Sequence, residues 1–277
     1  MEKSISYLIR ICLFFLLLYA SFVPVEGAGL QVYNAGGEKK TSGITSPMGK
    51  DEIVKSTQKK VFLTFDDGPS ITNTSKIIEI LKKNNIKATF FVVGTKIERY
   101  PDIVKEMNDN GMSICVHTYS HDYDKIYKSV DSYLGDMEQC NLAIKKITGK
   151  NVTPYVRLPG GSDNLVSGAG QMKKIRGTLQ DKKIRYVDWN VSSGDALSHL
   201  VPTYKLEKNV IEQCKNKTLA VVLMHDAYYK TTTVEALPAI ISNLKKEGFV
   251  FGTFDTITAK EEAALVRIRV INRGIAK

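Results

Sequence analysis

Cysteine is scarce in this sequence, and no segment repeats with a fixed period. The 277 residues include four Cys, one of which, Cys12, lies in an N-terminal apolar run. The other three, Cys115, Cys140 and Cys214, are an odd number with no pairing pattern, which argues against a disulfide framework. Cys115 lies within an apolar run typical of a strand, so we expect a buried free thiol there.

Long hydrophobic runs are also absent, except at the N-terminus. The exception spans residues 11–25 and follows the basic residues Lys3 and Arg10. A basic start, a short apolar core and small residues near Gly27 are typical of a secretory signal peptide, here residues 1–27. The alternative is an uncleaved membrane anchor, although the run is shorter than the roughly 20 apolar residues that a spanning helix prefers. Both alternatives predict export, secreted or at the cell surface, and the lack of a disulfide framework favours a bacterial envelope.

Acidic residues are the minority among the charged side chains. The chain has 29 Asp and Glu against 39 Lys and Arg, which gives a formal net charge of +10. Loss of residues 1–27 would remove two basic and two acidic side chains, so the charge would stay at +10. A basic exported protein is drawn to anionic surfaces such as a cell-wall polymer. Export argues against nucleic acid, the other common partner of basic proteins.

The composition changes twice after the apolar run. Residues 28–58 are rich in Gly, Ser, Thr and Lys, which indicates a linker. From residue 59 to 258, short apolar runs alternate with amphipathic helical patterns, which predicts βα units and a parallel sheet. Seven such units favour an α/β barrel, complete or incomplete, and residues 259–277 form a C-terminal tail that the pattern does not place. The expected strands span residues 61–65, 88–93, 113–116, 154–158, 184–189, 219–224 and 249–254.

Polar residues follow these strands at their carboxyl ends. In an α/β barrel the carboxyl ends of all strands share one rim, and chemistry takes place there. Separate loops would therefore deliver carboxylates, three His, an Arg and the only Trp to one mouth. In chain order these residues are Asp66 and Asp67, His117 and His121, Arg157, Asp188 and Trp189, and His225 and Asp226.

Asp66 and Asp67 stand next to each other between an apolar strand and a Gly-Pro turn. Neighbouring side chains on an extended backbone point opposite ways, so one carboxylate can bind a cation while the other moves protons. The alternative interpretation is a solvated Asp-Asp-Gly turn, because Asp and Gly are common turn residues.

His117 and His121 form a His-x3-His pair. Four-residue spacing puts both rings on one side of a helical turn, which suits a single metal ion. Together with a carboxylate from another strand end, the pair would form a site of two His and one carboxylate. Such a site suits Zn²⁺ with an open position for water, and it also suits Fe²⁺.

Taken in order, Asp-Asp-Gly, His-x3-His, Arg-x-Pro-Gly, Asp-Trp and Leu-x-His resemble the motifs of the polysaccharide deacetylases of the NodB-homology family, carbohydrate esterase family four. The match covers most of residues 60–255, within the domain expected over residues 59–258. The resemblance implies a distorted (β/α)7 barrel and metal-dependent N-deacetylation of acetylated amino sugars. It also implies a Zn²⁺ cofactor, or another divalent cation such as Co²⁺.

The resemblance implies a role for each motif residue. Asp66 matches the catalytic base of the family, and Arg157 matches the residue that orients this base. Asp67 matches the carboxylate that binds the metal, and His117 and His121 match the two metal-binding imidazoles. Arg157 can also be read as a purely structural ion-pair partner.

The later motifs match the remaining parts of the family site. His225 matches the general acid, and Asp188 matches the residue that tunes it. Gly160 stands where a backbone N–H of the family, often on a Tyr, helps to bind the oxyanion, and the missing side chain leaves that amide intact. Trp189 and Leu223 match residues that line the substrate groove. Asp188 can also be a cap of the next element, and a lone Trp is often part of a core.

The expected function is therefore removal of N-acetyl groups from an exported N-acetylhexosamine polymer. Peptidoglycan is the expected polymer, acetylated at N-acetylglucosamine or N-acetylmuramic acid. The alternatives are a chitooligosaccharide or acetylxylan deacetylase on the same fold, a non-catalytic sugar-binding protein, and an iron-dependent oxygenase with the same metal ligands.

Overall fold

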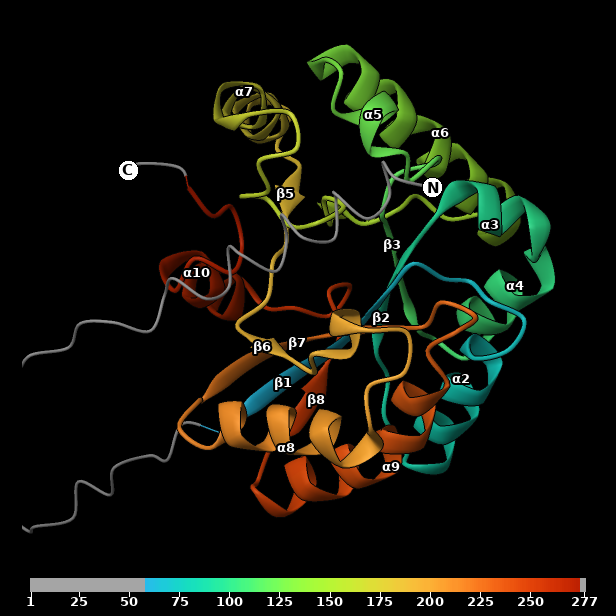
Figure 1. Cartoon of the computed structure of the whole chain (residues 1–277), viewed down its shortest axis with the longest axis vertical. Coiled ribbons are helices and arrows are strands. Elements are labelled where there is room, and N and C mark those ends of the chain that lie inside the picture. Colours follow the sequence, from blue (N-terminus) through green and yellow to red (C-terminus); the bar gives the residue numbers. More distant parts are fainter. Residues whose placement is uncertain (1–57, 275–277) are drawn as a thin grey trace, which may run out of the picture. The chain divides into compact units, whose positions relative to one another are not determined.

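The computed structural model describes residues 58–274, and its central strand is β1 (Lys60–Asp66) (Figure 1). Residues 61–66 of this strand are buried. Side chains alternate across a strand. Val61, Leu63 and Phe65 therefore join the hydrophobic cluster on one face of the sheet, while Phe62 joins a second cluster on the other face.

The sheet has eight parallel strands, and seven of them follow the order β5-β4-β3-β2-β1-β7-β6. The eighth strand, β8, pairs with the first half of β1, and β2 pairs with the second half along the same edge. The sheet curls, and its end strands β5 and β6 do not pair with each other. The strands are β2 (Thr89–Val92), β3 (Ser113–Val116), β4 (Tyr155–Val156), β5 (Arg185–Tyr186), β6 (Val191–Ser192), β7 (Leu219–His225) and β8 (Val250–Gly252).

Helices cover the outer face of the sheet in nearly the same order as the strands (Figure 1). Neighbours in contact follow the series α8, α9, α2, α4, α6 and α7. This succession results from connecting parallel strands through helices. The helices are α2 (Thr74–Lys83), α3 (Gly94–Arg99), α4 (Pro101–Asp109), α5 (Tyr123–Ile126), α6 (Val130–Thr148), α7 (Ala169–Asp181), α8 (Thr203–Cys214), α9 (Thr231–Lys246) and α10 (Ala259–Arg267), with a 3₁₀ turn, η1 (Asp195–Leu197).

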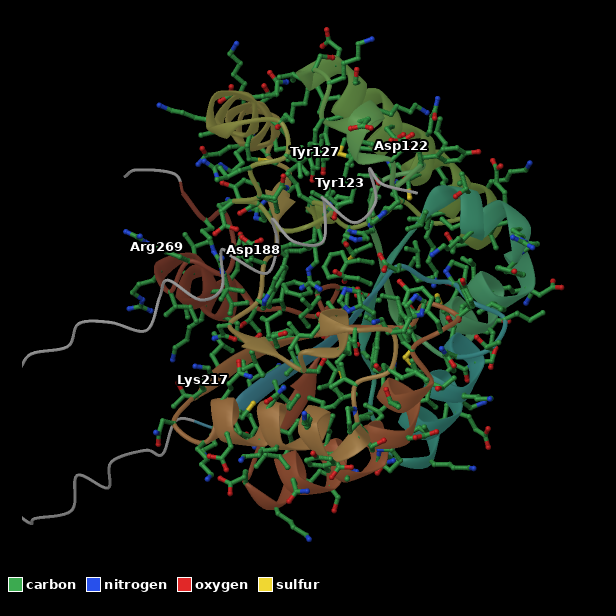
Figure 2. The ribbon with its side chains drawn as sticks, viewed as in Figure 1. Asp122, Tyr123, Tyr127, Asp188, Lys217 and Arg269 are labelled. Atoms are coloured by element: carbon green, nitrogen blue, oxygen red, sulfur yellow. The ribbon has the colours of Figure 1, made fainter. Side chains whose placement is uncertain are left out.

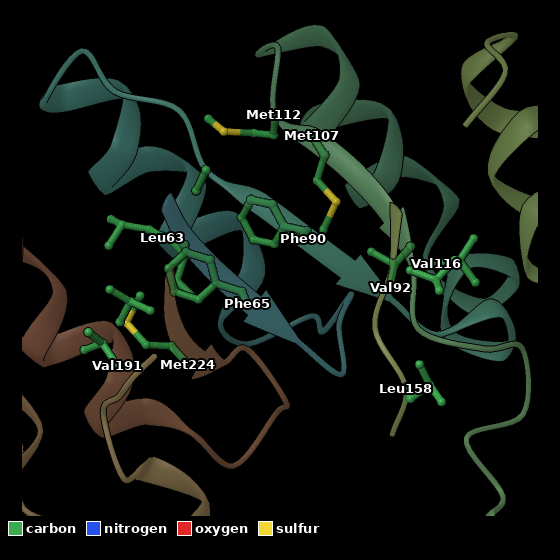
Figure 3. Close-up of a cluster of buried hydrophobic side chains, with 14 of the residues drawn as sticks. Leu63, Phe65, Phe90, Val92, Met107, Met112, Val116, Leu158, Val191 and Met224 are labelled. Carbon is green, nitrogen blue, oxygen red and sulfur yellow. The ribbon is translucent and has the colours of Figure 1, made fainter. Parts of the chain in front are cut away.

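The larger hydrophobic cluster lies between the sheet and these helices (Figure 3). Phe65 of β1 and Phe90 of β2 stack there, with ring centroids 5.2 Å apart. Truncating a buried Phe to Ala typically costs about 3–5 kcal/mol of folding free energy. This layer therefore fixes the strand ends that carry the polar residues. Cys115, Cys140 and Cys214 are buried and free, as expected of thiols without a disulfide framework.

The segment that the sequence pattern left unplaced is packed on the sheet. Helix α10 begins with a capping box between Thr258 and Glu261. Leu265, Val270 and Ile271 are buried in the second cluster, on the inner face of the sheet. Residues 259–274, which the sequence pattern did not place, therefore pack against the same sheet as the rest of the domain.

The observed elements differ from the prediction most clearly after β4 and at the short helix α3. The run at residues 184–189 forms only the short strand β5 before the chain crosses to β6. The N–H of Asp188 donates to Val270 O, and the side chain of Asn190 bonds to the backbone of β7, so the chain leaves β4. Helix α3 was not predicted, because its six residues carry only one buried apolar side chain, Ile97.

The predicted signal peptide or anchor and most of the linker lie outside the described residues. Within residues 58–274, no helix combines the length and apolar character needed to cross a membrane.

Candidate metal and catalytic site

Three potential metal ligands meet at the carboxyl ends of β1 and β3. One ligand atom each from Asp67, His117 and His121 lies within 4.8 Å of the others. Asp67 Oδ1 is 3.2 Å from His121 Nε2 and 3.6 Å from His117 Nε2. The structure thus brings together the three residues that the sequence predicted to share an ion.

The backbone at this site is strained. Asp67, Thr118 and His121 have positive φ angles of 76°, 70° and 53°. Each such conformation costs on the order of 1–3 kcal/mol in a non-glycine residue and persists only when the surroundings impose it. Asp136 supplies part of this constraint, because its buried carboxylate accepts bonds from Tyr119 N at 2.5 Å and Ser120 N at 3.0 Å.

The donor set fits a divalent cation. His117 Nδ1 lies 2.8 Å from the carbonyl oxygen of Arg157, which can only accept, so Nδ1 carries the proton and Nε2 keeps its lone pair. Burial lowers the pKa of His117 to about 4, so the ring is neutral at pH 7. Two donors on one tetrahedral ion with bonds of ~2.1 Å lie about 3.4 Å apart. The observed separations of 3.2 and 3.6 Å match this spacing.

Asp67 is ionised in this arrangement. Burial alone would raise the pKa of its carboxyl group. The hydrogen bond from His121 and the positive charge of His225 outweigh burial, and they hold the pKa well below its usual range. With a cation bound, one carboxylate and two imidazole nitrogens would supply one formal negative charge, which suits Zn²⁺ or a similar ion.

Asp66 and Arg157 form a buried ion pair next to the metal ligands. Arg157 Nη1 is 2.7 Å from Asp66 Oδ1 and 2.7 Å from Thr64 Oγ1. The guanidinium also donates to the carbonyl oxygens of Val187 and Asp188, and it lies over the ring of Phe91. Asp66 Oδ2, the oxygen that is not paired with Arg157, is 3.9 Å from His117 Nε2. One carboxylate oxygen is therefore fixed while the other faces the metal ligands.

His225 pairs with Asp195, a residue that the sequence did not single out. His225 Nδ1 is 2.8 Å from Asp195 Oδ1, and the backbone N–H of His225 donates to Asp195 Oδ2 at 2.7 Å. Thr233 Oγ1 donates to the same carboxylate at 2.9 Å. Burial alone would lower the pKa of His225, but the Asp195 carboxylate, with those of Asp67 and Asp66, raises it to about 9. The imidazole is thus protonated at pH 7.

The prediction that Asp188 tunes His225 is wrong in this structure. The Asp188 carboxylate accepts bonds from Ser162 N at 2.9 Å and Ser162 Oγ at 2.6 Å. Asp195 occupies the position beside His225 that was expected of Asp188. The chain crosses from β5 to β6 before it reaches β7, so the turn after β6 lies beside His225. The only feature of the sequence that could have indicated Asp195 is the polar Gly194-Asp195 turn, which follows a strand too short to predict.

The three residues predicted to contact substrate lie in different surroundings. Gly160 is exposed with a φ of 78°, and a Cβ there would be 3.0 Å from Tyr123 Oη. The Tyr123 ring in turn packs against His121, with centroids 5.5 Å apart. Trp189 is half-buried against the inner cluster, and Leu223 is 6% exposed. Gly160 is therefore the most accessible of the three.

Hydrogen bonds connect the loop that carries Asp66 and Asp67 with the loop that carries His225. Ser70 Oγ donates to Asp226 O, and Thr74 Oγ1 donates to Asp226 Oδ2, both at 2.6 Å. A Cβ at Gly68 would meet Asp226 Oδ2 at 2.1 Å, so only glycine permits this approach. These contacts fix the distance between the two sides of the mouth.

Comparison with known proteins decides the family. The sequence profile described as polysaccharide deacetylase matches residues 53–174. A peptidoglycan-N-acetylglucosamine deacetylase of Bacillus cereus is 30% identical over 205 residues, covering 71% of this chain and 70% of that protein. The chain belongs to the polysaccharide deacetylase family. The peptidoglycan-N-acetylmuramic acid deacetylase PdaA of Bacillus subtilis is 28% identical over 210 residues, covering 75% of this chain and 74% of that protein.

A solved structure of a polysaccharide deacetylase has the same fold. The catalytic domain of peptidoglycan N-acetylglucosamine deacetylase from Eubacterium rectale aligns with a TM-score of 0.67 and 36% identity, covering 73% of this chain and 90% of that chain. The likeness confirms the predicted distorted (β/α)7 barrel of the NodB type, here as a curled sheet that does not close. It also confirms the predicted enzyme class, because these deacetylases are hydrolases of carbon–nitrogen bonds other than peptide bonds.

Proposed function

We propose that this polysaccharide deacetylase removes N-acetyl groups from the N-acetylhexosamine residues of peptidoglycan. The observation that carries the proposal is the arrangement at the mouth. The ligand set of Asp67, His117 and His121 is flanked by a carboxylate, Asp66, and by a protonated imidazole, His225. Amide hydrolysis needs a proton acceptor for the attacking water and a proton donor for the departing amine, and these two residues supply both.

The proposed cofactor is Zn²⁺, with Co²⁺ as another candidate, held by Asp67, His117 and His121. When bound, such an ion polarises the acetyl carbonyl and lowers the pKa of a bound water towards ~7. Asp66 accepts the proton of the attacking water through Oδ2, the oxygen that is not paired with Arg157. Arg157 keeps the other oxygen in place, at 2.7 Å, so that the base does not rotate away.

His225 then protonates the leaving nitrogen. Asp195 holds Nδ1, which leaves the Nε2 proton for transfer. The same carboxylate keeps the imidazole charged until the transfer, because it raises the pKa of His225 to about 9. A positioned acid of this kind typically contributes ~10²–10⁴ in rate.

The Gly160 amide is the proposed donor to the oxyanion of the tetrahedral intermediate. Its support is the exposed position of Gly160 and the nearness of Tyr123, whose Oη would lie 3.0 Å from a Cβ at Gly160 and whose ring packs against the metal ligand His121. Removing one oxyanion donor costs about 3 kcal/mol in comparable hydrolases. Trp189 and Leu223 are the proposed walls for the sugar ring and the acetyl methyl group.

The choice of peptidoglycan rests on three observations that agree. Relatives from two Bacillus species are named as peptidoglycan deacetylases, one for N-acetylglucosamine and one for N-acetylmuramic acid. The formal net charge of +10 favours binding to an anionic cell wall. The N-terminal apolar run favours export to the bacterial envelope by a signal peptide, with membrane anchoring as the alternative.

Acetate release from defined glycans tests the proposal. The zinc-loaded full chain is incubated with purified sacculi, N-acetylated chitooligomers and acetylxylan. We expect acetate from sacculi at the highest rate, and mass spectrometry of digested sacculi then shows whether glucosamine or muramic acid was formed. Asp66→Asn should lower the rate by about 10²–10⁴ while metal content stays unchanged. Binding to sacculi without acetate release would instead identify a non-catalytic sugar-binding protein.

A further inference from the structure

The C-terminal segment runs along the free edge of β5, where the sheet fails to close. Val187 and Ile271 form an antiparallel bridge. The Asp188 N–H donates to Val270 O at 2.7 Å, and the Asn272 N–H donates to Tyr186 O at 2.9 Å. Figure 2 labels Asp188 beside this last part of the chain. The segment therefore brings residue 273 to the loops that follow β4 and β5.

Arg273 contacts both of those loops at once. Its Nη2 donates to the carbonyl oxygen of Trp189 at 3.1 Å, and Nη1 is 3.2 Å from Asp163 Oδ2. Its Nε is 3.4 Å from Asp188 Oδ2 and also donates to Arg269 O at 3.1 Å. A guanidinium presents five donors in a rigid fork, so one side chain can fix several acceptors together.

Asp188 connects Arg273 with the loop that carries Gly160. Its carboxylate is buried, accepts two bonds from Ser162, and is stabilised by the Arg273 cation. Gly160 and Gly161 both have positive φ angles, 78° and 87°. Glycine has the greatest conformational freedom of all residues, so two in succession hold one geometry only when neighbours impose it.

We propose that Arg273 is a positioning residue for deacetylation. It holds the oxyanion-binding amide of Gly160 in place through Asp188 and Ser162, and the inference rests on the role proposed for that amide above. The C-terminal segment is thus part of the catalytic apparatus although it lies far along the chain from every motif. The constraint acts on the transition state, because the oxyanion forms only there.

Three variants test the proposal in the zinc-loaded full chain. Arg273→Ala removes the fork, Arg273→Lys keeps the charge with a single donor group, and Arg269→Ala removes the same charge from an exposed neighbour. We expect Arg273→Ala to lower kcat about ten-fold with KM changed less than about two-fold, since small misplacement of a catalytic group has effects of this order. Arg273→Lys should recover part of the loss, and Arg269→Ala should match the wild type.

Trp189 gives a readout that does not depend on activity, because it is the only Trp in the chain. We expect Arg273→Ala to lower its fluorescence anisotropy and to speed amide exchange at residues 160–163. Zinc affinity should stay within about two-fold of wild type, because Arg273 contacts no metal ligand. Unchanged kcat together with unchanged Trp189 anisotropy overturns the proposal, and so does a loss confined to KM.

Ser162→Ala provides an independent variant at the other end of the same chain of contacts. Residues that act through one another are not additive. We expect the double variant Arg273→Ala with Ser162→Ala to lose no more kcat than the more damaged single variant, whereas a multiplicative loss contradicts the proposal. If the wild type releases no acetate from any glycan, the proposed function fails, while Trp189 anisotropy and amide exchange still decide whether Arg273 orders the loop.

Discussion

Two largely buried imidazoles at the mouth of the sheet have pKa values that are shifted in opposite directions. The side chains of His117 and His225 are 4% and 15% exposed. Nδ1 of His117 donates to a neutral carbonyl oxygen, whereas Nδ1 of His225 donates to the carboxylate of Asp195. The pKa of His117 is lowered to about 4 by burial, and the pKa of His225 is raised to about 9 by Asp195 against the effect of burial.

Because both rings are largely buried, the partner of Nδ1 assigns the role of each ring. A neutral acceptor fixes the tautomer and leaves a basic Nε2, which suits a metal ligand. A charged acceptor also fixes the tautomer, but it keeps the second proton in place, which suits a general acid.

Replacement of the ligand should have the largest effect. His117→Ala removes one of three donors, so we expect zinc affinity to fall at least about 100-fold and acetate release to fall to background. Metal content by mass spectrometry and acetate release are measured on the same samples. Full zinc occupancy in this variant would show that His117 is not a ligand.

Replacement of the acid should leave the metal in place. His225→Gln is expected to lower kcat by about 10²–10⁴ with unchanged zinc content, since only the proton donor is lost. His199→Gln is the matched control, because it makes the same change at an exposed His outside the ligand set. Loss of zinc from His225→Gln would mean that the two rings do not have separate roles.

The sequence predicted the ligands and the acid because parallel strands bring their carboxyl ends to one rim. Asp66, Asp67, His117 and His225 all stand at or directly after a strand, so the alternation of strands and helices was enough to place them together. Asp195 could not be placed in this way. It follows a two-residue strand whose pairing with β7 depends on contacts distant in sequence.

Asp136 and Arg273 were missed for a similar reason. Asp136 lies on the buried face of α6, and a sequence pattern assigns that face only to packing in the core. Its carboxylate nevertheless binds the backbone N–H groups directly before His121. Arg273 follows an apolar stretch with no clear period. Its position is set by pairing with β5, a contact over more than 80 residues of sequence.

Neutralising the partner of the acid should move the pH profile. Asp195→Asn removes the charge that raises the pKa of His225, so the pKa should fall from about 9 towards the ordinary value of ~6.5. We expect the alkaline limb of kcat to move down by about two pH units, and kcat at pH 8 to fall about 10–100-fold. An alkaline limb that stays in place would mean that Asp195 does not set the protonation of His225.

The smallest expected effect is on stability in the metal-free protein. His225 binds its proton more tightly when folded, so its contribution to the free energy of unfolding is fully present below pH ~6.5 and is lost as the pH rises through about 9. The expected size is about 3 kcal/mol, from a pKa raised from 6.5 to about 9. Urea unfolding at pH 6 and pH 10 measures it, and Asp195→Asn should show a smaller decrease between these values. Equal decreases in the two proteins would contradict the assignment.

Titration of the metal-free chain with zinc, with acetate release from sacculi followed at each step, tests whether one ion held by Asp67, His117 and His121 enables deacetylation. We expect the rate to rise in proportion to bound zinc and to stop rising at one ion per chain, while Asp66→Asn binds the same ion and releases almost no acetate. Full activity in the metal-free chain would contradict it, and so would one tightly bound ion with no acetate released by the wild type.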